Sequence, residues 1–81
     1  MSNGVALPNA EEIEKIIPII ENEFKAAKIA HGGFTRPERG GLMVAAKVAR
    51  EAWCGLERAL FAHGIVMVAV APGTIAFAVR R

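Results

Sequence analysis

Two histidines, His31 and His63, are the first side chains to consider for acid–base catalysis or metal binding, because an imidazole changes its charge near neutral pH and binds metals. Each stands between an alanine and a glycine. Neither has a cysteine or a carboxylate at the spacing of a metal site. The repeated pattern instead indicates two helix ends, where a partly cationic ring faces the negative end of the helix dipole.

Cys54 is the only cysteine, so the chain cannot form an internal disulfide. On a helix it would share a side with Lys47, Arg50 and Arg58, and neighbouring cations favour the reactive thiolate form of a cysteine. A nucleophile also needs a general base, and no histidine lies within a turn or two on the same side. Cys54 is therefore predicted to be a free thiol without a catalytic role.

Glycine pairs at positions 32–33 and 40–41 bracket Arg36 and Arg39, and glycine-rich backbone beside arginine can bind a phosphate. The spacing matches neither the Walker motif nor the dinucleotide-binding fingerprint. A flexible loop between two helices explains it better. Since no acid, base and nucleophile form one constellation, the sequence predicts a protein that is not an enzyme, without catalytic residues, cofactor or metal site.

Composition predicts a single small domain with more apolar surface than it can cover. Hydrophobic residues make up 53% of the 81 residues, which is above the usual range. The net charge of +2 is uneven: residues 1–34 hold three lysines against five glutamates, and residues 35–81 hold seven basic residues against three glutamates. The single cysteine and the lack of a basic start followed by an apolar run favour a cytoplasmic location.

The first predicted helix spans residues 9–31, after an arm at residues 1–8 that is expected to be flexible. Asn9 and Glu12 have the spacing of a capping box. Pro18 lies on the polar side, where a kink is tolerated. One apolar stripe recurs at steps of three and four residues: Ile13, Ile16, Ile17, Ile20, Phe24 and Ala27.

Residues 32–41 are predicted to be a connector, and residues 42–63 a second helix. Its bulky row suits packing on a sheet or on the first helix, and its row of small residues allows another backbone to approach closely. The bulky row is Leu42, Ala46, Ala49, Trp53, Leu56 and Leu60. The small row is Ala45, Val48, Ala52, Gly55 and Ala59.

Residues 65–79 contain no charge and predict a β-hairpin, with strands at 65–71 and 74–80 joined at Pro72-Gly73. Side chains alternate across a strand, so one register separates large from small residues. On the large face this register pairs Val70 with Ile75, Val68 with Phe77, and Val66 with Val79. The small face would carry Met67, Ala69, Ala76 and Ala78.

These elements predict an α+β fold, with two helices packed on a C-terminal antiparallel β-hairpin. Two strands are marginal alone, and the helices cover one face only, so the sheet is expected to be extended or covered by dimerisation. The predicted function is a small non-catalytic protein–protein interaction module (an adaptor, an assembly subunit or an inhibitor of another protein) that acts as a homodimer. Predicted contact residues are Met67, Ala69, Ala76 and Ala78, with Arg36 and Arg39 at the rim.

Two alternatives stay open. The first is nucleic-acid binding by the basic residues of the second half, although three glutamates interrupt them and no exposed aromatic residues are expected for base stacking. These basic residues are Arg36, Arg39, Lys47, Arg50, Arg58, Arg80 and Arg81. The second is a single membrane span over residues 59–79, which have about the right length. His63, Gly64, Pro72 and Gly73 within that stretch disfavour the membrane interpretation.

Overall fold

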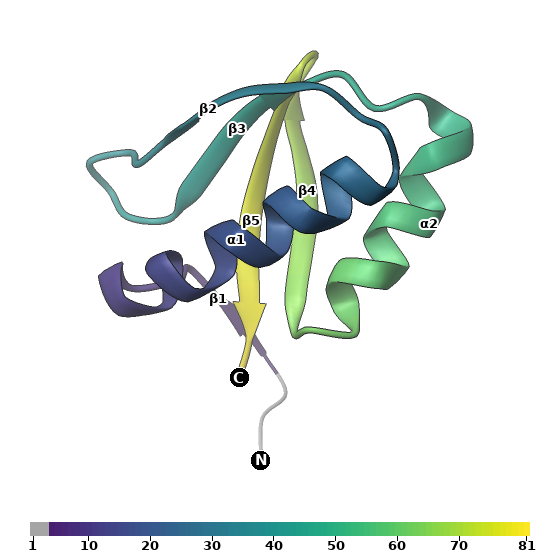
Figure 1. Ribbon diagram of the computed structural model, residues 1–81. Helices are drawn as coiled ribbons and strands as arrows, with labels where there is room; N and C mark the ends of the chain where they lie inside the picture. The colour runs from purple at the N-terminus through teal and green to yellow at the C-terminus, as the bar shows by residue number, and fades with distance from the viewer. Residues whose placement is uncertain (1–3) are drawn as a thin grey trace.

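A computed structural model describes residues 4–81 as one five-stranded antiparallel sheet with two helices on one of its faces (Figure 1). The α+β class is confirmed, but the sheet is larger than the expected C-terminal hairpin. The elements in chain order are β1 (Val5–Ala6), α1 (Ala10–Ala26), β2 (His31–Thr35), β3 (Leu42–Ala46), α2 (Arg50–Phe61), β4 (Ile65–Ala71) and β5 (Thr74–Arg80).

β5 is the central strand. Along one side it pairs with β4. Along the other side it pairs first with β3 and then, at its last two residues, with β1. β2 lies outside β3, so β4 forms one edge of the sheet, and β2 together with the short β1 forms the other. Part of the arm expected to be flexible is therefore a strand, β1, while residues 1–3 lie outside the described part of the chain.

α1 begins with the expected capping box. The Asn9 side chain accepts from the Glu12 N–H at 2.8 Å, and the Asn9 N–H donates to Glu12 Oε1 at 2.9 Å. Pro18 lies inside the helix on its exposed side. Four members of the apolar stripe are buried: Ile13, Ile16, Ile20 and Phe24.

The helix ends earlier than the expected residue 31. Lys28 adopts a left-handed conformation with φ of 60°, and the Ile29 N–H donates to the Phe24 carbonyl at 2.9 Å. These are the features of a Schellman turn, which usually has a glycine at the left-handed position. Because Lys28 takes that position, the chain has already left the helix when it reaches His31, which begins β2.

The expected second helix over residues 42–63 is wrong in its first part, and the expected connector contains β2. Leu42, Val44 and Ala46 are all buried, with the two-residue period of a strand. Gly40 and Gly41, both at φ of 98°, turn the chain between β2 and β3. A five-residue apolar run fits either period, so its sequence alone does not separate strand from helix.

The core lies between the helices and the inner face of the sheet. In Figure 1, α1 crosses in front of the strands and α2 lies beside β4, on the side away from β5. Leu56 and Leu60 anchor α2 in this core. β3, β4 and β5 contribute Leu42, Val44, Ala46, Ile65, Met67, Ile75, Phe77 and Val79.

β4 and β5 have the bounds expected, but not the expected register. The ladder pairs Ile65 with Val79 and Met67 with Phe77, one residue away from the expected pairing. An irregularity between Ala69 and Ala71 leaves Val70 as an extra residue, which is a β-bulge. A shift of one residue exchanges the two faces of a strand.

Candidate interaction surfaces

The bulge in β4 separates the four predicted contact residues. Ala76 and Ala78 lie on the face of the sheet that points away from the helices, as the sequence indicated. Met67 and Ala69 pair with the inward-facing residues of β5 instead. Met67 is 4% exposed and belongs to the core, so it is not available to a partner in the folded protomer.

The sheet face opposite the helices, called the outer face below, has almost no charge. The strand registers assign to it Val5, Thr35, Met43, Ala45, Val66, Val68, Thr74, Ala76, Ala78 and Arg80. No element of residues 4–81 packs over it, and Val68 is 45% exposed. Its one cation, Arg80, lies at a corner with its guanidinium carbon 4.4 Å from the centre of the Phe61 ring. A contiguous apolar surface of this kind is typical of a contact region.

The backbone of β5 bonds to its two neighbours alternately. The Arg80 N–H donates to the Gly64 carbonyl at 2.9 Å, which is on the β4 side. On the β3 side, the Gly73 carbonyl accepts from the Ala46 N–H at 2.9 Å. Even-numbered residues of β5 therefore bond to β4, and odd-numbered residues bond to β3 and β1.

β4 consequently has an open row of backbone groups. Val66 and Val68 pair with the even-numbered residues of β5. Ile65, Met67 and Ala69 then direct their N–H and C=O groups away from β5, towards the edge, where no other strand of the described part of the chain lies next to β4. Within residues 4–81 no hydrogen bond outside the ladder uses these groups.

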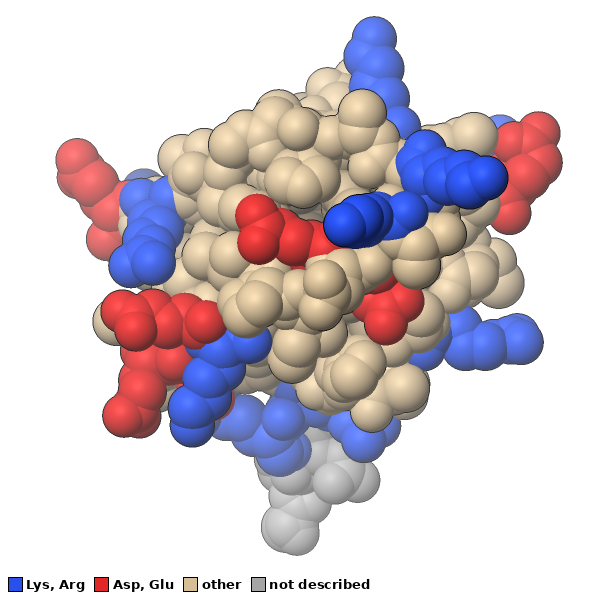
Figure 2. Space-filling view, in the orientation of Figure 1, with Lys and Arg blue, Asp and Glu red and all other residues tan. Residues whose placement is uncertain are grey.

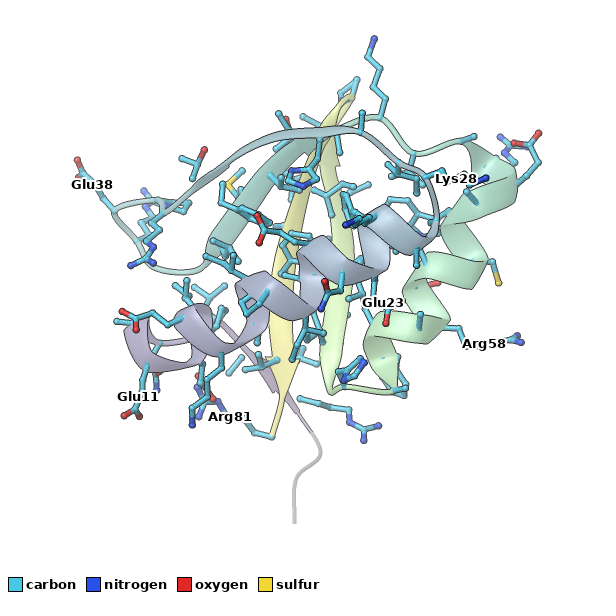
Figure 3. All side chains as sticks on the ribbon, in the orientation of Figure 1. Glu11, Glu23, Lys28, Glu38, Arg58 and Arg81 are labelled. Carbon is cyan, nitrogen blue, oxygen red and sulfur yellow. The ribbon has the colours of Figure 1, made fainter. Side chains whose placement is uncertain are left out.

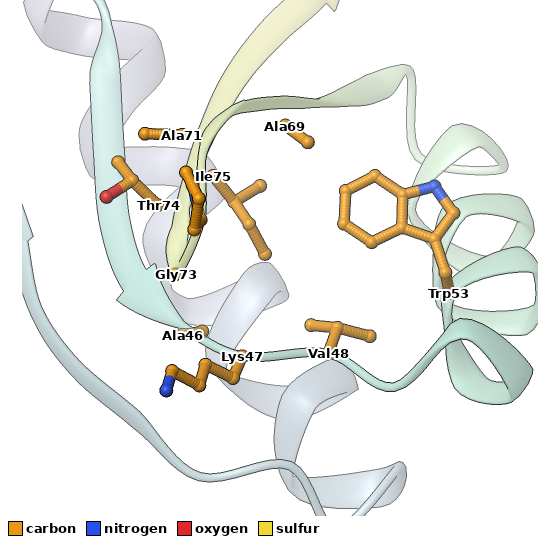
Figure 4. Close-up of a pocket in the computed structure, with 10 residues that line it drawn as sticks. Ala46, Lys47, Val48, Trp53, Ala69, Ala71, Gly73, Thr74 and Ile75 are labelled. Carbon is orange, nitrogen blue, oxygen red and sulfur yellow. The ribbon is translucent and has the colours of Figure 1, made fainter.

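Two hollows lie between α2 and this edge strand. The first, called the Trp53 hollow, has a volume of 380 Å³ and lies between Trp53 of α2 and the hairpin tip (Figure 4). Ala69 and Ile75 line its strand side, and Val48 and Lys47 line the opposite side. Small alanine side chains at the tip leave the space beside the indole unfilled.

The second hollow, called the Phe61 hollow, lies at the other end of β4. It has a volume of 340 Å³ and is lined by Cys54, Glu57, Arg58, Phe61 and Val66. Four of these residues belong to α2 and one to β4. The spacing of Cys54, Arg58 and Phe61 places them along one side of the helix. The sequence placed Cys54 beside Arg58, but it gave no indication that this side of α2 flanks a free strand edge.

The two histidines are in different surroundings. His31 belongs to β2, not to a helix end, with its ring centre 5.4 Å from those of Phe24 and Phe34. Its Nδ1 donates to the Gly32 carbonyl at 2.6 Å. His63 follows α2, as expected of a helix end, with Nε2 at 3.6 Å from Glu23 Oε2. No three potential metal ligands gather in the described part of the chain.

The basic residues named for nucleic-acid binding are spread over several elements. Arg36 and Arg39 lie in the turn between β2 and β3, while Arg81 pairs with Glu12 at 2.7 Å. Arg58 and Arg81 lie at opposite sides of the view in Figure 3. In Figure 2, Lys and Arg side chains alternate with Glu around the outline and over α1. That face shows no single basic patch.

None of the helices in residues 4–81 has both the length and the apolar composition needed to cross a bilayer. Comparison of the chain with models of known protein families, with curated proteins and with solved structures finds no match.

Proposed function

We propose that this protein is a non-catalytic interaction module that works as a homodimer, in which a second copy covers the outer face of the sheet. The observation that carries the proposal is the uncharged character of that face. Alanines occupy its middle, at Ala76 and Ala78, and the larger apolar side chains of Met43, Val66 and Val68 flank them. Two sheet faces of this kind can pack at the usual separation of about 10 Å.

A second copy is a suitable occupant because of the symmetry of such a contact. In a dimer with a two-fold axis, both protomers use the same surface for the contact. A charged group near the axis would therefore lie close to the same group of the partner. The middle of the outer face has no charged group, and Arg80 lies at a corner where it is already stacked on Phe61. Association would remove the exposed Val68 and the half-buried Met43 from water, which is favourable.

The test is the oligomeric state of the protein and of two charge variants. Multi-angle light scattering at micromolar concentration is expected to give twice the protomer mass for the unaltered chain. Ala76→Glu should give a folded monomer, because it places a carboxylate in the middle of the outer face. Ala10→Glu is the matched control, since Ala10 is exposed at the start of α1. A monomeric unaltered chain, or two variants with equal masses, would contradict the proposal.

A further inference from the structure

The free edge of β4 is unusual for a natural sheet. Exposed edge strands generally carry charges or proline, or are very short, because an open row of backbone groups recruits other strands. β4 has seven residues without a charge or a proline, and its bulge lies close to its end. β2, the other edge, is shorter and contains two glycines and a register shift.

α2 turns this edge into a groove. The helix lies beside β4 on the side away from β5, in the layer of the helices (Figure 1). Trp53 is near one end of the strand and Phe61 is near the other, so the Trp53 hollow and the Phe61 hollow flank the row of free N–H and C=O groups. A strand placed against β4 would have its inward-facing side chains beneath α2.

The groove favours an isolated strand over a second copy of β4. Leu56 and Leu60 fix α2 in the core, so a second copy would bring its own α2 to the same edge. Two antiparallel β4 strands would then bring both copies of α2 to the seam between the strands, one against the other. An extended segment without a helix layer of its own avoids this collision.

The lining of the groove indicates the chemistry of that segment. Both hollows are mainly apolar and would accept apolar side chains. Each also carries a cation, Lys47 in one and Arg58 in the other, and neither makes an ion pair within residues 4–81. Among residues 4–81, Glu57 is the one acidic residue that lines either hollow, so the lining has an excess of positive charge.

We propose that the groove between α2 and β4 binds an extended segment of another protein, which adds to the sheet as a sixth strand next to β4. The segment has apolar side chains at alternate positions and an acidic residue near one end. Its backbone bonds to Ile65, Met67 and Ala69. Its inward-facing apolar side chains enter the Trp53 hollow, and a side chain of its other face lies in the Phe61 hollow, whose strand side is the outward-facing Val66. Strand addition of this kind takes affinity from main-chain bonds and specificity from pockets for alternate side chains.

The probe is a random octapeptide library displayed on phage and selected on the purified protein. The expected outcome is enrichment of peptides with apolar residues at every second position and at least one acidic residue. An enriched peptide is then titrated while the fluorescence of Trp53, the only tryptophan, is followed. Methylation of alternate peptide nitrogens on the side facing β4 should weaken binding at least tenfold, because it removes donors to the strand edge.

A protein variant tests the same contact from the other side. Ala69→Pro removes an edge N–H that the β5 ladder does not use, and proline is tolerated where the N–H faces solvent. It should weaken binding at least tenfold, whereas Ala69→Ser, which keeps the N–H, should change it less than threefold. If Ala69→Pro fails to fold, amide exchange of the unaltered protein decides. Ile65, Met67 and Ala69 should exchange fast alone and at least tenfold more slowly with peptide.

Several outcomes would overturn the proposal. They are the absence of any enriched peptide, equal binding of the methylated peptide, and edge amides that are already protected in the free protein. Amide shifts confined to Ala76 and Ala78 would place the peptide on the outer face instead. The oligomeric state is measured separately, so failure of the groove and failure of the proposed dimer are distinguishable.

Discussion

Met67 of β4 lies opposite Phe77 of β5, and both side chains are buried beneath the helices, at 4% and 1% exposure. The next residue of β4, Val68, lies opposite Ala76 on the outer face and is 45% exposed. This arrangement assigns every side chain of β4 to one face or the other. It also makes Ile65, Met67 and Ala69 the residues whose backbone groups face the open edge.

The first prediction tests this register. Met67→Ala should lower the free energy of unfolding by about 2–5 kcal/mol, because it leaves a cavity beside Phe77. Val68→Ala should lower it by about 1 kcal/mol or less, because the valine is largely in water. Urea denaturation of both variants is the measurement, at a dilution where light scattering gives a monomer. The register expected from the sequence would give the reverse order, so a larger loss for Val68→Ala would contradict the structure.

The hairpin shows how far the sequence determines the fold. Both strands and their turn follow from the uncharged run around Pro72-Gly73, because alternation and turn chemistry are local properties. The bulge at Val70 is not local. It places Ile65 and Met67 in the core instead of two valines, and it leaves Ala69 beneath Trp53. Which of two acceptable faces is buried depends on the volume left by α1 and α2, and that volume is set by residues far away in the sequence.

The contrast between local sequence patterns and long-range packing also explains which other elements the sequence predicted correctly and which it did not. The capping box at Asn9 and the stripe from Ile13 to Phe24 depend on neighbouring residues, and they were predictable. Leu42–Ala46 is a strand because it pairs with β5 and with β2, which a local period does not reveal. The groove between α2 and β4 could not be predicted from the sequence for a related reason. It exists only because β4 is an edge and α2 lies beside it.

The second prediction separates two roles of Glu12, which caps α1 and also pairs with Arg81 at 2.7 Å. Glu12→Gln should keep the cap, since glutamine also serves in a capping box, and lose the ion pair. The expected loss is less than about 1 kcal/mol, because both side chains are partly in water. Asn9→Ala removes the cap itself and should lose about 1 kcal/mol.

A double-mutant cycle with Arg81→Gln provides the control for Glu12. If the ion pair is the only interaction lost, Glu12→Gln should have no further effect on thermal or urea stability once Arg81 is replaced. An undiminished effect in the Arg81→Gln background would show that Glu12 acts through the cap alone. Raised salt should weaken the Glu12–Arg81 contribution and leave the effect of Asn9→Ala nearly unchanged.

The third prediction compares glycine-to-alanine substitutions at Gly41, which has a positive φ, and at Gly55, which lies in a helix. Gly41 has φ of 98°, and a Cβ there would lie 3.2 Å from Leu7 Cδ2. Gly41→Ala should therefore lower the free energy of unfolding by about 1–3 kcal/mol, mainly through backbone strain. Gly55 lies within α2, where a Cβ would meet nothing within 4 Å. Gly55→Ala should raise the free energy of unfolding by about 0.5–1 kcal/mol, because alanine loses less backbone entropy in a helix.

Both glycine variants are measured by urea denaturation, with circular dichroism to confirm that the helix content is retained. Both variants add the same methyl group. Changes of opposite sign in the free energy of unfolding would therefore report the difference in backbone conformation between the two sites. Equal destabilisation would mean that Gly55 is not in a regular helix. That would remove the basis for placing Cys54, Arg58 and Phe61 along the side of α2 that flanks β4. A stabilised Gly41→Ala would show that the turn between β2 and β3 does not hold the left-handed conformation that joins them.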